Sequence, residues 1–297
     1  MKVVITGAAG MLGRDIEIAA DAVHHEVAAL GREDLDVTDE AAVRDAFERE
    51  LPQVVINCAA FTDVDLAETQ EHAAHELNAT AAATVSAAAA EVGAKIIYPS
   101  TDYVFDGVKT EPYDESDQPN PQTAYGRTKL AGEIATAEAN PRHAIIRTSW
   151  LFGLNGPNFV ETMLSLSERQ SEVLVVRDQV GCPTFTGHLA PAIVELLDYE
   201  LLGTMHIAGG GHCSWYDFAR EIFRQSQLDV TVLSGSSEML GRPAVRPPFS
   251  ALVSGRDDVP VLPRWDHGLH AYLARRAERV AAGADPATGI SGQGRES

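Results

Sequence analysis

One glycine-rich segment near the N-terminus constrains the fold more than any other part of the sequence. Gly7, Gly10 and Gly13 form a G-x-x-G-x-x-G motif between the apolar run 2–6 and a helical pattern over 10–21. Glycines at these spacings allow a tight turn and let the backbone approach a ligand closely. The first turn of the following helix presents free N–H groups and a positive dipole to a pyrophosphate. The motif therefore predicts a dinucleotide-binding unit at the start of the chain.

The rest of the first half alternates between short apolar runs and helical patterns. Strands are expected at 2–6, 25–30, 53–57, 94–98 and 143–148, and helices at 10–21, 39–49, 71–91 and 123–139. Such alternation is typical of βαβ units, whose strands form one buried parallel sheet. We therefore predict an α/β fold with a Rossmann-type, doubly wound parallel sheet.

The second half is less regular. Helices are expected at 157–169, 187–198, 214–226 and 265–281, strands at 172–176 and 204–207, and a loop over the Pro-rich stretch 241–250. We predict an NAD(P)-binding Rossmann domain over 1–150 and a smaller, mainly substrate-binding α/β part over 151–280, with sheet and helices interleaved between the two. The last residues, 281–297, have no apolar period and are expected to form a disordered tail.

Composition excludes several classes of function. The 297 residues include 43 Asp and Glu but only 23 Lys and Arg, which gives a net charge of −20. Binding to nucleic acid is therefore not expected, since it depends on cations that neutralise phosphates. No run of 18 apolar residues exists, so no membrane span is expected. The acidity itself fits either adaptation to high salt or an ordinary acidic protein, and melting curves at molar salt separate the two.

The cysteines and the N-terminus point to a compartment. The three cysteines form no CxxC pair, which argues against a disulfide framework and fits a reducing environment. The first residues open on a strand pattern, and their apolar run is too short for a signal peptide. A cytoplasmic protein is expected.

Three side chains form the predicted catalytic group. Tyr125 and Lys129 make a Y-x-x-x-K motif on the helix 123–139, where positions i and i+4 share one face. A nearby ammonium favours the phenolate, so we expect Lys129 to lower the tyrosine pKa from its usual value of about 10. Thr101 follows a strand, and its hydroxyl is placed to donate a hydrogen bond to a developing oxyanion.

Several longer motifs resemble one family. They are NCAAFTDVDLAE at 57–68, STDYVF at 100–105, YGRTKLAGE at 125–133, RTSWLFG at 147–153, DQVGCPT at 178–184 and RPPFSAL at 246–252. The glycine spacing and the Tyr–Lys pair resemble the extended short-chain dehydrogenase/reductase superfamily. The motifs together resemble the dTDP-4-dehydrorhamnose reductase family over nearly the whole chain. This resemblance implies NADPH- or NADH-dependent reduction of the C4 keto group of dTDP-4-dehydro-6-deoxy-L-mannose to dTDP-L-rhamnose.

Two alternatives stay open. One is a reductase or epimerase of another nucleotide sugar, and the other is a non-catalytic, NADP-binding regulatory subunit. A related 4,6-dehydratase activity is disfavoured, because those enzymes carry Thr-Asp-Glu where this chain has Thr101, Asp102 and Tyr103. Eliminating water needs that acid and base, whereas reduction of a carbonyl does not.

The resemblance also implies contacts for the two ligands. Arg32 follows the second strand, where an arginine accommodates the 2′-phosphate of NADP(H), so NADPH is favoured over NADH. Trp150 offers an apolar face to the sugar, and Arg246, with Arg242 next, would supply a cation for the diphosphate. The expected cofactor-binding residues are Gly7, Gly10, Met11, Leu12, Gly13, Arg32, Asp36, Val37, Ala59, Ala60, Phe61, Tyr125 and Lys129. The expected substrate-binding residues are Thr101, Asp102, Trp150, Gln179 and Arg246.

The sequence says less about metal binding and about the oligomeric state. The ten histidines form no paired ligand spacing, so no catalytic metal is expected. Some members of the family bind Mg²⁺ at a dimer interface, but its carboxylates cannot be matched here residue by residue. The chain is therefore expected to act as a monomer or homodimer on a nucleotide-sugar substrate.

Overall fold

The computed structural model describes residues 1–200 and 202–283. The tail predicted to be disordered lies outside the described residues from position 284 onward. Within the described part of the chain, no helix is both long and apolar enough to cross a membrane.

A six-stranded parallel sheet forms the centre of the molecule, with the strand order β10-β5-β4-β3-β1-β2. The order of the strands reverses between β1 and β3, and ligands bind at such a switch point beyond the carboxyl ends of the strands. The predicted doubly wound fold is thus confirmed. The strands are β1 (Lys2–Thr6), β2 (Glu26–Leu30), β3 (Val54–Asn57), β4 (Lys95–Thr101), β5 (His143–Thr148) and β10 (Gly203–His206).

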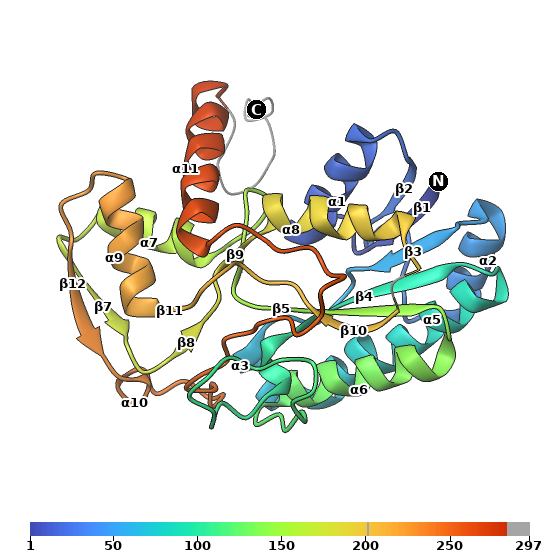
Figure 1. Ribbon diagram of the computed structural model, residues 1–297, viewed down its shortest axis with the longest axis horizontal. Helices are drawn as coiled ribbons and strands as arrows, with labels where there is room; N and C mark the ends of the chain where they lie inside the picture. Colours follow the sequence, from blue (N-terminus) through green and yellow to red (C-terminus); the bar gives the residue numbers. More distant parts are fainter. Residues whose placement is uncertain (201, 284–297) are drawn as a thin grey trace, which may run out of the picture.

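Helices cover both faces of this sheet. On one side α1 (Met11–Ala22) packs against α8 (Thr186–Glu195); on the other lie α2 (Glu40–Glu50), α5 (Ala81–Glu91) and α6 (Ala124–Ala139) (Figure 1). Successive side chains of β1 belong to the cores on opposite faces of the sheet. Val3 and Ile5 pack in the core beside α8, whereas Val4 packs in the core beside α2 and α5. The strands are therefore buried on both faces, as a parallel sheet requires.

The predicted helix 71–91 is one helical path with a change of pitch. It consists of α4 (Glu71–His75), a π-helical turn η1 (Glu76–Thr80) and α5. The carbonyl of Asn78, within the π turn, accepts a hydrogen bond of 2.8 Å from the Tyr98 hydroxyl. Gly132 of α6 leaves room for this contact, because a Cβ there would lie 2.0 Å from that carbonyl oxygen. The π turn thus joins this helix to β4 and α6.

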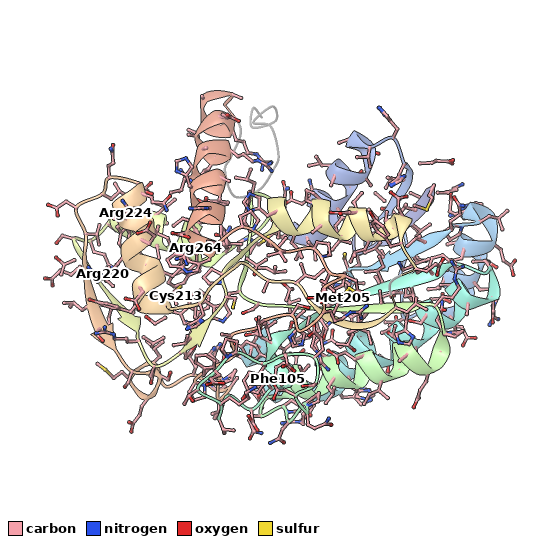
Figure 2. The ribbon with its side chains drawn as sticks, in the orientation of Figure 1. Phe105, Met205, Cys213, Arg220, Arg224 and Arg264 are labelled. Carbon is pink, nitrogen blue, oxygen red and sulfur yellow. The ribbon has the colours of Figure 1, made fainter. Side chains whose placement is uncertain are left out.

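The second half builds a smaller lobe around its own aromatic core. Phe152, Phe185, Phe218 and Tyr272 are fully buried there. Figure 2 labels Met205 in the core of the main sheet and Cys213 in the core of the smaller lobe. The helices are α7 (Phe159–Ser167), α9 (Trp215–Gln225), α10 (Ser237–Leu240) and α11 (Trp265–Ala281), and a short 3-10 turn η3 (Leu196–Asp198) follows α8.

The strands of this lobe are short and pair two by two. They are β6 (Leu151–Phe152) with β9 (Thr184–Phe185), β7 (Glu172–Val176) with β12 (Thr231–Gly235), and β8 (Val180–Gly181) with β11 (Cys213–Ser214). β12 and α10 were not predicted from the sequence, and neither was α3 (Val64–Thr69) of the first half. The second half also returns to the main sheet, because it supplies both α8 and β10.

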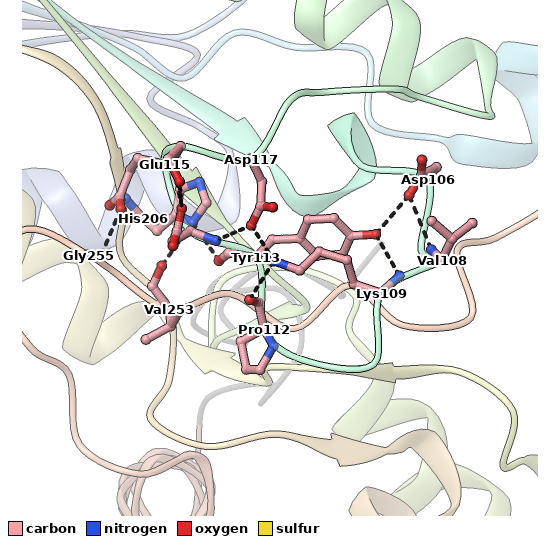
Figure 3. A network of polar contacts seen from close by, with 12 residues as sticks. Asp106, Val108, Lys109, Pro112, Tyr113, Glu115, Asp117, His206, Val253 and Gly255 are labelled. Atoms are coloured by element: carbon pink, nitrogen blue, oxygen red, sulfur yellow. Dashed lines mark hydrogen bonds and ion pairs between the residues drawn. The ribbon is translucent and has the colours of Figure 1, made fainter.

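A polar network fastens the segment after β4 to the second half (Figure 3). The backbone N–H of His206 donates to Glu115 Oε1 at 2.7 Å, and the N–H of Gly255 donates to Glu115 Oε2 at 2.8 Å. Nδ1 of His206 lies 3.1 Å from the carbonyl oxygens of both Tyr113 and Val253. Three segments far apart in sequence therefore meet at the edge strand β10.

Candidate active site

A cavity of about 500 Å³ opens where the strand order reverses. Its first wall is formed by Gly7, Gly10, Met11, Leu12, Gly13, Asn57, Cys58, Ala60, Thr62 and Val64. Its floor is formed by Pro99, Ser100, Thr101, Asp102, Tyr103, Tyr125 and Lys129, and its second wall by Thr148, Ser149, Trp150, Leu151, Pro157 and Trp215. Both halves of the chain therefore contribute to one site.

The glycine loop fits a dinucleotide. Gly7 has a φ of +64°, and a Cβ there would lie 2.5 Å from the backbone nitrogen of Ala59. No side chain caps Gly10 at the start of α1, and the first turn of that helix carries no acidic residue. The N–H groups and the positive end of α1 are thus left to the cavity, where they suit a pyrophosphate.

The other predicted cofactor residues lie in two groups. Ala60 lines the cavity, and Ala59 and Phe61 flank it without lining it. Arg32 and Asp36 are exposed beyond β2, while Val37 is buried in the adjoining core. The cavity therefore brings together the glycine loop and the catalytic group, and it does not include these last three residues.

The catalytic group converges from β4 and α6. Thr123 caps α6 by accepting a hydrogen bond of 3.0 Å from the N–H of Gly126, which sets Tyr125 in the first turn. Thr101 is the last residue of β4, and it lines the same cavity as Tyr125. Lys129 Nζ donates to the carbonyl of Pro99 at 2.8 Å. The three predicted residues therefore share one pocket.

Burial governs the protonation of this group. It raises the pKa of Tyr125 to about 12, although the neighbouring Thr101 hydroxyl acts in the opposite direction. It lowers the pKa of Lys129 to about 7, and the charge of Glu133 partly offsets this. The expectation that Lys129 lowers the tyrosine pKa is therefore wrong for this structure, since burial and the charge of Asp102 raise it. Tyr125 is a protonated phenol at neutral pH.

Asp102 is a second ionisable group beside the reacting centre. It is almost fully buried and accepts hydrogen bonds from the hydroxyls of Thr101, at 3.1 Å, and Ser250. Burial raises the pKa of Asp102 to about 6, and these hydrogen bonds limit the rise. Tyr103, the next residue, meets the ring of Tyr125 edge-on, with 5.6 Å between the ring centroids.

Two tryptophans form the second wall. The rings of Trp150 and Trp215 are parallel to within 3°, with centroids 3.5 Å apart. Sequence reasoning identified Trp150 but missed Trp215, because the cap at Ser214 predicts a helix there but not which side chain faces the cavity. The Trp215 indole N–H donates to Gln179 Oε1 at 3.2 Å. Gln179 therefore lies behind the tryptophan pair and does not line the cavity.

The predicted cations for the substrate lie outside the cavity lining. Arg246 makes a two-pronged ion pair with Asp65, and Arg242 lies 3.8 Å from the same carboxylate. Lys129 is the one cationic side chain among the described residues that line the cavity. The roles of Gln179 and Arg246 as substrate contacts therefore stay predictions.

Across residues 1–200 and 202–283, no three His, Cys, Asp or Glu side chains gather as a metal site would require. An interfacial Mg²⁺ would take its ligands from two subunits, so it stays a prediction.

Comparison with known proteins places this geometry in a family. The family model described as "RmlD substrate binding domain" matches residues 1–277. The dTDP-4-dehydrorhamnose reductase of Streptomyces griseus is 43% identical over 259 residues, which is 85% of each chain.

Two solved structures are also similar. The dTDP-4-dehydrorhamnose reductase of Clostridium acetobutylicum superposes with a TM-score of 0.89 at 44% identity, covering 93% of this chain and 99% of that one. The Bacillus anthracis enzyme, in complex with NADP, has a TM-score of 0.90 at 38% identity and covers 92% of this chain and 99% of that one. With the glycine loop, the Thr–Tyr–Lys group and the whole fold in agreement, the chain belongs to the dTDP-4-dehydrorhamnose reductase family.

Proposed function

We propose that this protein is an NADPH-dependent dTDP-4-dehydrorhamnose reductase, which converts dTDP-4-dehydro-6-deoxy-L-mannose into dTDP-L-rhamnose. One observation carries the proposal: Thr101, Tyr125 and Lys129 line the same cavity as the glycine loop. A carbonyl bound there meets a proton donor beside a dinucleotide site. Relatives named as reductases and the NADP complex of a similar structure support it.

The first wall of the cavity would hold the cofactor. The amides at the start of α1 would receive the pyrophosphate, and Lys129 would hold the nicotinamide ribose. Arg32, exposed just after β2, would meet the 2′-phosphate and favour NADPH over NADH. When bound, NADPH supplies the hydride for C4.

Tyr125 would donate the proton that the new alkoxide requires. Because burial raises its pKa to about 12, the phenol stays protonated throughout the physiological range and serves as an acid in the direction of reduction. Thr101 would hold the same oxygen. Its hydroxyl donates to Asp102 at 3.1 Å and accepts from the N–H of Tyr103 at 3.2 Å, so its one proton would turn from Asp102 to the substrate oxygen. Preorganised donors of this kind stabilise the charge that develops on the oxygen.

The second wall would hold the sugar. Trp150 lines the cavity, where an indole suits the C6 methyl group, and the carboxyl of Asp102 would accept a hydrogen bond from a sugar hydroxyl. We also propose a cytoplasmic location, in keeping with the three cysteines, which are all free thiols.

The test is NADPH oxidation with dTDP-4-keto-6-deoxy-L-mannose, generated in place by the upstream enzymes. Tyr125→Phe should lower kcat by ~10²-fold or more while NADPH binding is retained. Tyr216→Phe, the same chemical change on α9 outside the cavity lining, should leave both values unchanged. Loss of NADPH binding together with turnover would count against the assigned role of Tyr125.

The same assay separates the two alternatives. Faster turnover of another keto sugar in a substrate panel would point to a different nucleotide-sugar reductase. Tight NADPH binding without turnover of any keto sugar would favour the regulatory class.

A further inference from the structure

The carboxylate of Asp65, on α3, accepts three hydrogen bonds from the segment 241–250 of the second half. Its Oδ1 accepts hydrogen bonds from Arg246 Nη1 at 3.0 Å and from the N–H of Ala244 at 3.2 Å, and its Oδ2 accepts one from Arg246 Nη2 at 2.8 Å. Arg246 Nη1 also donates to the carbonyl of Ala244 at 3.1 Å. One carboxylate thus organises both the side chain and the backbone of this loop.

The guanidinium of the pair is more buried than the carboxylate. The side chain of Arg246 is 11% exposed and that of Asp65 is 30% exposed. The guanidinium lowers the pKa of Asp65, chiefly through the hydrogen bonds between them. Two-pronged Arg–carboxylate pairs combine strength with a fixed geometry. Both terminal nitrogens of Arg246 are therefore engaged before any diphosphate arrives.

The pair also reaches the catalytic group by two routes. On one side, the charge of Arg246 acts on Tyr103, whose ring meets Tyr125 edge-on. On the other, α3 touches the start of α6, since Glu68 Oε1 accepts a hydrogen bond of 2.9 Å from the N–H of Ala124. Tyr125 thus lies next to Tyr103, and the helix that carries it is joined to α3, which holds Asp65.

We propose that Asp65 is a positioning residue for the reduction. By holding Arg246, it fixes the segment 241–250 against α3 and sets Tyr103 against Tyr125. In this assignment Arg246 is a clamp between the two halves of the chain, and it is not the cation that binds the diphosphate of the substrate. The inference rests on the reductase function proposed above.

A double-mutant cycle tests this assignment in the full-length protein. Asp65→Asn and Arg246→Gln should each lower kcat by ~10-fold or more, because small misplacements of catalytic groups are costly, while KM for the nucleotide sugar changes by less than ~3-fold. The double variant should be no slower than the slower single variant, since both changes break the same contact.

Hydrogen–deuterium exchange supplies a readout that does not depend on turnover. The backbone amides of 241–250, including the N–H of Ala244, should exchange faster in Asp65→Asn than in the wild type. Asp258→Asn is the matched control: it changes a two-pronged pair with Arg256, at 2.9 Å for both contacts, outside the cavity lining. This control should alter neither kcat nor exchange in 241–250.

Two results would overturn the inference. One is a ~10-fold rise in KM for Arg246→Gln at unchanged kcat, with Asp65→Asn neutral or better than wild type, which would make Arg246 a diphosphate ligand. The other is unchanged exchange in 241–250 after Asp65→Asn. If the wild type itself does not turn over the keto sugar, the proposed function fails, and the exchange experiment still decides the clamp.

Discussion

The two walls of the cavity are built in different ways. On the cofactor side, each functional residue follows a strand of the main sheet or lies in the first turns of the next helix, as Gly7, Thr101 and Tyr125 do. On the substrate side, Trp150 and Trp215 come from short elements that long-range contacts hold in place. The first wall follows from local sequence and the rules of parallel sheets, whereas the second depends on contacts that no local pattern encodes.

Each wall also relies on a glycine for close approach, but against a different neighbour. A Cβ on Gly7 would meet the backbone of Ala59 at 2.5 Å, whereas a Cβ on Gly181 would meet the indole ring of Trp150 at 2.4 Å. At Gly7 the absence of a side chain lets two backbone segments touch. At Gly181 it lets the indole ring of Trp150 pack against the backbone. Variants at these two positions should damage different binding steps.

The largest effect is expected for Gly7→Ala. Gly7 has a φ of +64°, and an added methyl group would collide with the backbone of Ala59. The loop must therefore shift, and NADPH affinity should fall by ~10²-fold or more. Fluorescence titration with NADPH measures this. Gly93→Ala is the control, because Gly93 has a φ of +75° but no atom within 4 Å of its Cβ. An equal loss in both variants would mean that backbone strain alone, and not close approach, sets the affinity.

A smaller effect, confined to the other wall, is expected for Gly181→Ala. The methyl group should displace the Trp150 ring from its stack on Trp215 and raise KM for the nucleotide sugar by ~10-fold, with NADPH affinity unchanged. Steady-state kinetics and NADPH titration measure the two values. Gly235→Ala on β12, next to the exposed Leu174, should change neither. A matching loss of NADPH affinity in Gly181→Ala would show that the two walls do not act separately.

The smallest effect is a pH dependence of cofactor binding. The ammonium of Lys129, with a pKa of about 7, loses its proton as pH rises through neutrality, so NADPH affinity should fall by several-fold, on the order of the lost charge interaction, between pH 6 and pH 8.5. Lys129→Met should bind NADPH weakly, with a flat profile over the same range. A falling profile in Lys129→Met would assign the titration to another group.

The same lysine should affect stability in the opposite sense. Its folded-state pKa lies below the value of 10.5 expected in the unfolded chain, so between these two pH values the unfolded chain binds more protons. The contribution of Lys129 to the free energy of unfolding therefore increases with pH across this window. Thermal unfolding of the wild type and Lys129→Met at pH 7 and pH 9 should reveal this difference, and equal shifts in the two proteins would contradict it.

Most of the main sheet and its catalytic group could be predicted from the sequence, because strand ends and helix starts carry recognisable signals. The expected strand 94–98 began one residue early and ended three residues early, because parallel pairing continues past Pro99 to Thr101. β12 and α10 could not be predicted from weak local patterns. Neither the ion pair between Asp65 and Arg246 nor the pKa of Tyr125 follows from spacing, because both depend on which segments the fold buries together.

The return of the chain to its first sheet has a consequence for synthesis on the ribosome. Until residue 206 has emerged, β5 is an open edge, and the face of the sheet later covered by α8 exposes Ile5, Ile56 and Ile146. Unpaired edges and uncovered apolar faces are where nascent chains aggregate. A nascent chain that stalled after residue 150 would contain every residue of the catalytic group, but its main sheet would still lack β10. The order of translation thus makes the completion of the cofactor sheet wait for the second half of the chain.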